Sequence, residues 1–341
     1  MDRSFQSPFI NPSYFPDYDI NKIPEIFSPL IISQSYREIQ TKSLADDFYS
    51  NLLDWHNDKI YFAIEDTVYI HDFHTSKTSL LQTIYDNNIT CVKGIGTKLL
   101  LGTSSGHLHT LDLIKNKINR NLVHKSRIGV IKIENNTILT GSRDKKIKLI
   151  DTRSGKITSV ICQHSQEVCG MDLNKNFKTL VTGGNDNKMY IFDYRNLDLP
   201  LKKCNQHKAA VKGISFSPLN TNLFVTGGGS ADKTVKLWDM SLINNTNNNL
   251  LVKSTNYGSQ ICNLKWLRNN QILSTHGYSK DDIRMCGSYD FQCTRQFLGH
   301  RNRVIHFSVS EDEKYFVTGS SDCNIRFWEI YGETRKELEI R

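Results

Sequence analysis

The chain has 341 residues, of which 38% are hydrophobic and 23% are charged, a balance typical of a soluble globular protein. It contains no run approaching the ~18 consecutive apolar residues of a membrane-spanning helix. Its first residues also lack the apolar stretch of a secretory signal. We therefore expect an intracellular protein with no membrane partner.

The formal net charge of +8 is compatible with nucleic acid or another acidic partner. The basic residues are nevertheless scattered, without a run of five or six, so we expect a solvated surface and no nucleic-acid partner. The eight cysteines form no Cys-x-x-Cys pair. This predicts reduced, buried thiols and neither a metal nor another cofactor.

One short pattern recurs along the chain: a β-rich run, Thr-Gly or a related pair, a turn that contains Asp, and a second β-rich run. Its copies lie at 99–112, 138–151, 180–193, 224–239, 272–285 and 316–329, of which the first and fifth are divergent. A spacing of about 40–45 residues with a Trp-Asp ending is the signature of WD repeats. Each unit predicts strands joined by tight turns.

Three alternating stretches at 51–55, 60–66 and 67–73 add one repeat upstream. Seven repeats predict an all-β fold, a seven-bladed WD-repeat β-propeller in which each blade is a four-stranded antiparallel sheet. Because the ring must close, we predict that the strand at 36–40 supplies the outer strand of blade seven.

The predicted propeller covers residues 35–330. Residues 1–34 contain five of the seven prolines, which predicts an extended N-terminal arm. Residues 331–341 form a short C-terminal tail.

A histidine precedes most repeats. In WD repeats this histidine forms a hydrogen-bonded tetrad with a strand Thr or Ser, a turn Asp and a Trp. Two blades carry the complete set, which is His207, Thr226, Asp232 and Trp238 in blade five and His300, Thr318, Asp322 and Trp328 in blade seven.

Histidine–carboxylate pairs also act as catalytic bases, but pairs that recur with the repeat are structural. The glycines at 227–229 lack the Lys-Ser/Thr and the helix of a phosphate-binding loop. We therefore predict that the protein is not an enzyme and has no catalytic residues.

Several stretches are more specific than WD repeats in general. They are DDFYSNLLDW (46–55), HSQEVCGMDL (164–173), HKAAVKGISFSP (207–218), TGGGSADKTVKLWD (226–239), GSQICNLKW (258–266), STHGYS (274–279) and GHRNRVIHFSVS (299–310). In this order they resemble the fizzy and fizzy-related co-activators of the anaphase-promoting complex, with the fizzy-related branch favoured. The resemblance implies a nuclear and cytoplasmic substrate receptor of this ubiquitin ligase, active in cell-cycle proteolysis.

The resemblance also implies where degrons bind. The family holds a Lys-Glu-Asn degron on the top face, near the central channel. The matching positions in this chain are Asn185, Asn187, Ser230, Gln260 and Arg326. Amides offer a peptide both donors and acceptors, and Arg326 suits the degron's glutamate. The alternative roles are turn residues for the asparagines and a solvated strand residue for the arginine.

The family binds the destruction box, Arg-x-x-Leu, at the side, between blades one and seven. Asp54 matches the acidic residue that receives the degron's arginine, and Leu53 contributes to the apolar side. The alternative for Asp54 is a structural carboxylate in a turn or tetrad.

The terminal Ile340 and Arg341 match the family's anchor to a helical-repeat subunit of the ligase. The family's N-terminal Asp-Arg-Phe/Tyr-Ile-Pro motif has no clean copy, since Asp2-Arg3 is followed by Ser4-Phe5. We expect a monomer outside the complex. The alternative function is a generic WD scaffold in another assembly, such as RNA processing, because a fold does not dictate a function.

Overall fold

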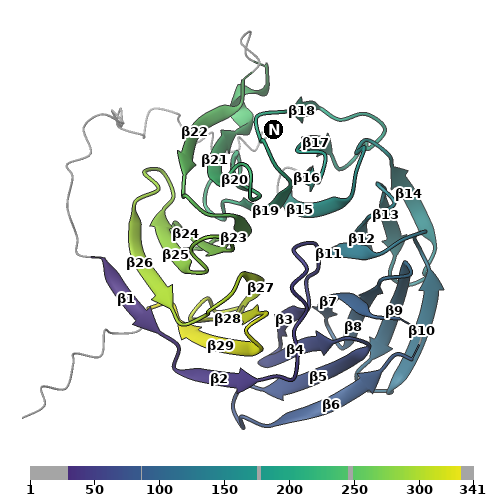
Figure 1. Ribbon diagram of the computed structural model, residues 1–341. Helices are drawn as coiled ribbons and strands as arrows, with labels where there is room; N and C mark the ends of the chain where they lie inside the picture. The colour runs from purple at the N-terminus through teal and green to yellow at the C-terminus, as the bar shows by residue number, and fades with distance from the viewer. Residues whose placement is uncertain (1–29, 86, 175–177, 245–248, 332–341) are drawn as a thin grey trace, which may run out of the picture.

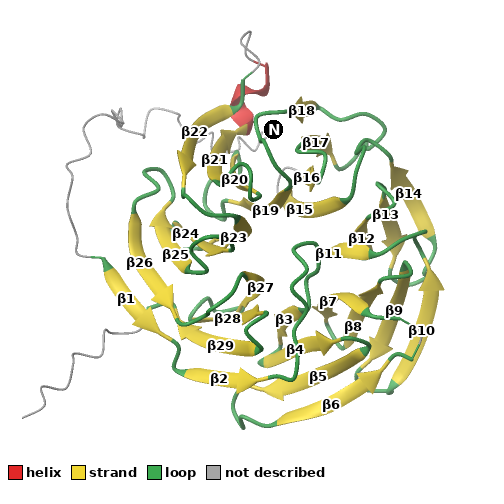
Figure 2. Cartoon of the chain, viewed as in Figure 1, coloured by secondary structure: helices red, strands yellow, loops and turns green. Residues whose placement is uncertain are grey.

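The structure, a computed structural model, describes residues 30–331 apart from 86, 175–177 and 245–248. Within these residues the chain forms strands β1 to β29 and one short 3₁₀-helix, η3 (Met240–Asn244). The strands make seven separate sheets, arranged around a central axis as the blades of a propeller (Figure 1). Strands and loops account for nearly all of the described chain (Figure 2). The predicted seven-bladed fold is confirmed.

Blades one to four follow one another along the chain, and in each the first strand lies nearest the axis. Blade one contains β3 (Leu53–His56), β4 (Lys59–Ile64), β5 (Thr67–Asp72) and β6 (Thr78–Thr83). Blade two contains β7 (Ile89–Ile95), β8 (Lys98–Thr103), β9 (His107–Asp112) and β10 (Lys117–Leu122). Blade three contains β11 (Ile128–Glu134), β12 (Thr137–Ser142), β13 (Ile147–Asp151) and β14 (Ile157–Ile161). Blade four contains β15 (Val168–Asn174), β16 (Thr179–Gly184), β17 (Met189–Asp193) and β18 (Lys202–Cys204).

Blades five to seven complete the ring. Blade five contains β19 (Val211–Phe216), β20 (Leu223–Gly228), β21 (Thr234–Asp239) and β22 (Leu251–Asn256). Blade six contains β23 (Ile261–Trp266), β24 (Gln271–His276), β25 (Ile283–Gly287) and β26 (Cys293–Leu298), with β1 (Ile31–Gln34) added at its outer edge. Blade seven contains β27 (Val304–Val309), β28 (Tyr315–Ser320), β29 (Asn324–Glu329) and, as its outer strand, β2 (Arg37–Gln40).

The ring closes through β2, as predicted for residues 36–40. This strand pairs antiparallel with β29 in the register Arg37↔Phe327 to Gln40↔Asn324. The Tyr36 ring packs edge-on against Phe327, and the Arg37 guanidinium lies 5.4 Å from the centre of the same ring. An N-terminal strand thus completes a blade whose other three strands come from the C-terminal end of the propeller.

The boundary of the N-terminal arm differs from the predicted one. Residues 31–34, assigned to the arm by sequence, form β1 and pair parallel with β26 from Ile31↔Arg295 to Gln34↔Leu298. The last proline before this strand is Pro29, so every amide in it can donate to the sheet. The sheets of the propeller therefore begin at Ile31, and residues 1–29 lie outside the described chain.

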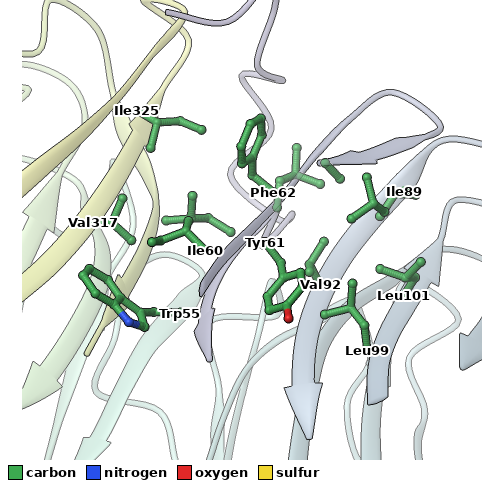
Figure 3. Close-up of a cluster of buried hydrophobic side chains, with 14 of the residues drawn as sticks. Trp55, Ile60, Tyr61, Phe62, Ile89, Val92, Leu99, Leu101, Val317 and Ile325 are labelled. Carbon is green, nitrogen blue, oxygen red and sulfur yellow. The ribbon is translucent and has the colours of Figure 1, made fainter. Parts of the chain in front are cut away.

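Apolar side chains fill the spaces between neighbouring blades. Figure 3 shows one such cluster, in which Ile60 and Phe62 of blade one lie between Val317 of blade seven and Leu99 of blade two. These four side chains are at most 2% exposed. Burial of this kind supplies the main stabilising term of the fold, and because each cluster joins two or more blades, the blades stabilise one another.

The predicted histidine tetrads are hydrogen-bonded networks. In blade five, His207 bonds Asp232 at 2.6 Å through Nδ1 and Thr226 at 2.6 Å through Nε2, and the Trp238 indole donates to the same hydroxyl at 2.7 Å. Blade seven repeats this arrangement, with three distances of 2.8–2.9 Å among His300, Asp322, Thr318 and Trp328.

These networks favour neutral histidines. Burial lowers the pKa of His207. Burial would raise the pKa of Asp232, but the hydrogen bonds that Asp232 accepts from His207 and Thr234 outweigh this effect and hold its pKa at about 2. An enclosed, fully hydrogen-bonded histidine has no free nitrogen for a substrate. The pairs serve to fasten the loop before each inner strand to the body of the blade.

Candidate functional site at the channel mouth

Residues 41–52, the crossing segment, link β2 of blade seven to β3 of blade one. Figure 1 shows this dark purple stretch running across the centre of the ring. Its hydrogen bonds reach blades three, four, five and seven through Asn51 to Gly129, Tyr49 to Asn185, Ser50 to Lys212 and Asp46 to Arg303. The segment therefore covers one mouth of the central channel.

Around this mouth stand the residues that immediately precede the inner strands, which we call the mouth residues. In blades two to seven they are Asn88, Arg127, Glu167, Ala210, Gln260 and Arg303. They occupy equivalent positions of the repeat but differ in charge and size. A surface that breaks the repeat in this way is suited to recognising an asymmetric ligand such as a peptide.

Arg127 is held by two carboxylates. Its Nε and Nη2 donate to the two oxygens of Glu167 at 2.6 and 2.7 Å, and its Nη1 donates to Asp47 at 2.6 Å. Burial disfavours the cation, but these carboxylates raise the pKa of Arg127 above its usual value. The guanidinium lies 5.0 Å from the centre of the Tyr49 ring, which anchors the crossing segment electrostatically and by stacking.

Tyr49 connects this anchor to a predicted degron residue. Burial raises the pKa of its phenol to about 12, so the hydroxyl is protonated and donates to Asn185 Oδ1 at 2.6 Å. The amide of Asn185 in turn donates to Gln166 Oε1 at 2.8 Å. Asn185 thus presents its amide at the mouth in a fixed orientation.

A second anchor lies across the mouth, in blades six and seven. Arg303 Nε donates to Asp46 Oδ1 at 2.9 Å, and its guanidinium lies 4.8 Å from the centre of the Tyr278 ring. Beside it Gln260 Oε1 is buried and has no hydrogen-bond partner among the described residues. Tyr278 is 57% exposed. This corner combines a cation, an aromatic surface and an unused acceptor.

The other predicted degron residues lie at different depths. Asn187 occupies the left-handed position of the blade-four turn, with φ 62°, and Ser230 is exposed in the corresponding loop of blade five. Arg326 lies on β29, separated from the axis by β27 and β28. Its Nη1 donates to Ser35 and pairs with Glu38, both at 3.0 Å. The structure thus brings Asn185 and Gln260 to the mouth but places Arg326 further out, beside β2.

Asp54 is buried on β3 and already has three partners. Its carboxylate accepts from Lys93 Nζ at 2.7 Å, from the Gly94 amide at 2.9 Å and from Ser308 at 3.2 Å. Its side chain is only 6% exposed, and both Asp54 and Leu53 border the central cavity. The residue does lie beside blade seven, through Ser308, but its carboxylate is already paired with Lys93.

Sequence reasoning missed the two arginine anchors and the acidic residues that hold them. Arg127, Arg303, Asp46 and Asp47 were not singled out, although Asp46 and Asp47 belong to the stretch on which the resemblance rested. A signal was present: across blades two to seven the residue before each inner strand varies, while the residue that follows it is always Ile or Val. The contact of the crossing segment with these residues is set by tertiary structure alone.

Ile340, Arg341 and the N-terminal Asp-Arg-Ser-Phe stretch lie outside the described residues. Within the described ranges no three His, Cys, Asp or Glu side chains are grouped as metal ligands. In the same part of the chain, no helix is long and apolar enough to cross a membrane.

The fold and its asymmetric mouth define a WD-repeat propeller built as a binding platform. Comparison with known proteins makes the assignment specific. The CDC20/Fizzy WD40 domain model matches residues 39–328, so the chain belongs to the CDC20/Fizzy family.

Its relatives include the B-type cell cycle switch protein ccs52A of Medicago truncatula, 32% identical over 97% of this chain and 69% of that protein. They also include the APC/C activator protein CDH1 of Saccharomyces cerevisiae, 32% identical over 89% of this chain and 53% of that protein. A chain in the crystal structure of the mitotic checkpoint complex superposes with a TM-score of 0.83 and 28% identity, covering 89% of this chain and 98% of that one. The chain thus spans about half to two thirds of these two relatives' length.

Proposed function

We propose that this protein is a degron receptor and activator of the anaphase-promoting complex, which brings substrates to the ligase for ubiquitin-dependent proteolysis. The observation that carries the proposal is a complete CDC20/Fizzy propeller whose relatives include a yeast APC/C activator. The chemistry of ubiquitin transfer belongs to the ligase. This chain contributes recognition, so its work is done by a surface and not by a catalytic centre.

We place the Lys-Glu-Asn degron at the channel mouth. The degron's glutamate is complementary to Arg303, which lies beside the exposed Tyr278 ring. Its asparagine and lysine can donate to the oriented Asn185 carboxamide oxygen and, once binding uncovers it, to Gln260 Oε1, which has no hydrogen-bond partner among the described residues. Asn187 and Ser230 supply further polar contacts from the turns of blades four and five.

Arg326 acts, on this proposal, at the outer limit of the degron site. Its pairing with Glu38, a side chain that is 55% exposed, is a surface ion pair of low net stability. An incoming degron carboxylate can therefore replace Glu38 at little cost. Asp54 and Leu53 remain the candidates for a destruction box, with Lys93 as the group that its arginine must displace.

The remaining parts of the proposal concern assembly. Ile340 and Arg341 would anchor the chain to a helical-repeat subunit of the ligase, and the protein would act as a monomer in the nucleus and cytoplasm. Deleting these two residues should abolish co-purification with ligase subunits while leaving degron binding intact. Retention on RNA with a steep salt dependence, and no ligase subunits, would favour the RNA-processing alternative instead.

Degron binding is tested by fluorescence anisotropy with a labelled Lys-Glu-Asn peptide. We expect a Kd in the micromolar range, about −8 kcal/mol. Both Arg303→Ala and the double variant Asn187→Ala with Arg326→Ala should weaken binding at least about tenfold. The exposed Arg153→Ala serves as the matched control and should not change the Kd. Unaltered affinity in both test variants would refute the site.

A further inference from the structure

Beneath the crossing segment the central channel contains a cavity of ≈ 260 Å³. All seven inner strands contribute to its wall, through residues such as Leu53, Val92, Ile131, Met171, Ile214, Leu264 and Phe307. A water molecule needs about 30 Å³ in the liquid, so the space is large enough for a small polyatomic ion together with water. The wall is apolar in part, but its polar groups are strongly biased towards positive charge.

Each inner strand places one residue at the same level along the channel axis. These residues are equivalent because each one pairs with the same position of the second strand of its blade. In blade order they are Asp54, Lys93, Lys132, Asp172, Ser215, Lys265 and Ser308. This ring therefore holds three lysines and two aspartates. A position that is apolar in most β-sheet cores is here polar in all seven blades.

Four of the charged residues in the ring neutralise one another. Lys93 Nζ lies 2.7 Å from Asp54, and Lys132 Nζ lies 3.0 Å from Asp172. The third lysine, Lys265, has no hydrogen bond or ion pair with any described residue. Burial, together with the neighbouring lysines, lowers its pKa despite the attraction of Asp172. Its ammonium group thus lines the cavity without a carboxylate of its own.

A fourth lysine stands above the ring. Lys212 is 5% exposed, and its Nζ donates to the carbonyls of Ser50 at 2.9 Å and Ile305 at 3.4 Å. No described carboxylate lies within ion-pair distance, and the Phe48 ring covers it at 5.4 Å. Burial lowers the pKa of Lys212 to about 8, which leaves it mostly protonated at neutral pH. An enclosed ammonium without a counter-ion is costly.

The four lysines and two aspartates leave two positive charges in one cavity. We propose that the central cavity, which both Lys212 and Lys265 line, is a binding site for a small free dianion of the phosphate or sulfate class, attracted by these two uncompensated charges. A single dianion balances both positive charges, whereas a single chloride ion balances only one of them. The crossing segment covers the mouth on its own side, so the ion enters from the opposite face.

The experiment is isothermal titration of the full chain with sodium sulfate, and separately with sodium phosphate, at pH 7 and constant ionic strength in sodium chloride. We expect saturable binding of about one ion per chain, with a Kd in the millimolar range, about −4 kcal/mol. Lys265→Met should weaken binding at least about tenfold, because one of the two unpaired charges is lost. Lys212→Met should do the same.

Lys146→Met is the matched control, since it removes one exposed lysine and changes the net charge equally; its Kd should stay within about twofold of wild type. Circular dichroism checks that each variant is folded. If Lys212→Met does not fold, the affinity of Lys265→Met for the anion decides the test by itself. Absence of saturable binding beyond the chloride reference overturns the proposal. So does an affinity for sulfate that Lys265→Met and Lys146→Met lower equally.

Discussion

At the scale of single residues, the repeat separates structural from functional side chains. Blade six shows how far the structural set can change. Tyr257 stands where blades three, four, five and seven have the histidine, and a histidine is found instead at His276 on β24, where Nδ1 lies 2.6 Å from Asp282. The turn carboxylate thus keeps an imidazole partner, here from β24. Arg284 takes over the link to the loop before the inner strand, since it donates to Asp282 at 2.9 Å and to the Tyr257 carbonyl at 3.3 Å.

Removing the central hydroxyl of a tetrad should be strongly destabilising. Thr226→Val keeps the shape of the side chain, but in a fully buried site it deprives Trp238 of its acceptor and His207 Nε2 of the hydroxyl that donates to it. Each lost partner costs about 1–3 kcal/mol, so we expect a loss of about 2–4 kcal/mol in the free energy of unfolding, measured by urea denaturation. The exposed Thr97→Val should change it by less than about 0.5 kcal/mol. Equal stability of the two variants would contradict the structural role of the tetrad.

His306 should make stability depend on pH. Burial and the nearby Lys212 lower its pKa to about 3, while the unfolded chain has the ordinary value of about 6.5. Below pH 6.5 the unfolded state therefore binds the extra proton, and stability falls as pH decreases towards 3. At pH 5 the loss from this residue is about 2 kcal/mol relative to pH 7.

The check compares urea denaturation at pH 7 and pH 5 for wild type, His306→Asn and His74→Asn. The His306 variant should show a smaller difference between the two pH values, because it has lost the buried titrating group. His74 is 69% exposed, so its variant should retain the wild-type difference. A His306 variant with the full wild-type pH dependence would rule out this origin.

At the scale of elements, two short N-terminal strands do different things. β2 completes blade seven and closes the ring, whereas β1 extends a blade that already has four strands. Sequence predicted β2, because closure requires a strand at that point. The sequence did not predict β1, because this strand is not part of the repeat. It pairs parallel with β26 only because the fold leaves the outer edge of β26 unpaired.

Truncation should therefore affect stability in two steps. Removing residues 1–34 deletes β1 but keeps the Tyr36 and Arg37 contacts with Phe327, so we expect a fall in Tm of only a few degrees, equivalent to about 1 kcal/mol. Removing residues 1–42 also deletes β2 and opens the ring, and should lower Tm by more than about 10 °C. Differential scanning calorimetry distinguishes the two. Equal melting temperatures would mean that β2 does not close the ring.

At the scale of the whole molecule, the fold was predictable and the site only partly so. Strand alternation and turn residues are local properties that repeat along the chain, so the blades follow from sequence. The mouth arises where six blades and the crossing segment meet, and the pairing of Arg127 with Asp47 joins residues far apart in the sequence. Asn185 and Gln260 were identified only through the family resemblance. No local pattern distinguishes Lys265, which has no partner among the described residues, from the paired Lys93.

The same interdependence predicts that the propeller unfolds as one unit, although it is built from seven sheets. The apolar clusters each join neighbouring blades, and β2 leaves no free end in the ring, so no blade can open without exposing its neighbours' core.

The four tryptophans can report the unfolding of single blades, since they lie in blades one, five, six and seven at Trp55, Trp238, Trp266 and Trp328. We expect the urea transition of each single-tryptophan protein, followed by fluorescence, to coincide with its own transition by circular dichroism. In the chain lacking residues 1–42, the reporters in blades one and seven should unfold at lower urea than Trp238, because the opened ring frays at the cut. Separate transitions in the closed ring would instead show that the blades unfold independently.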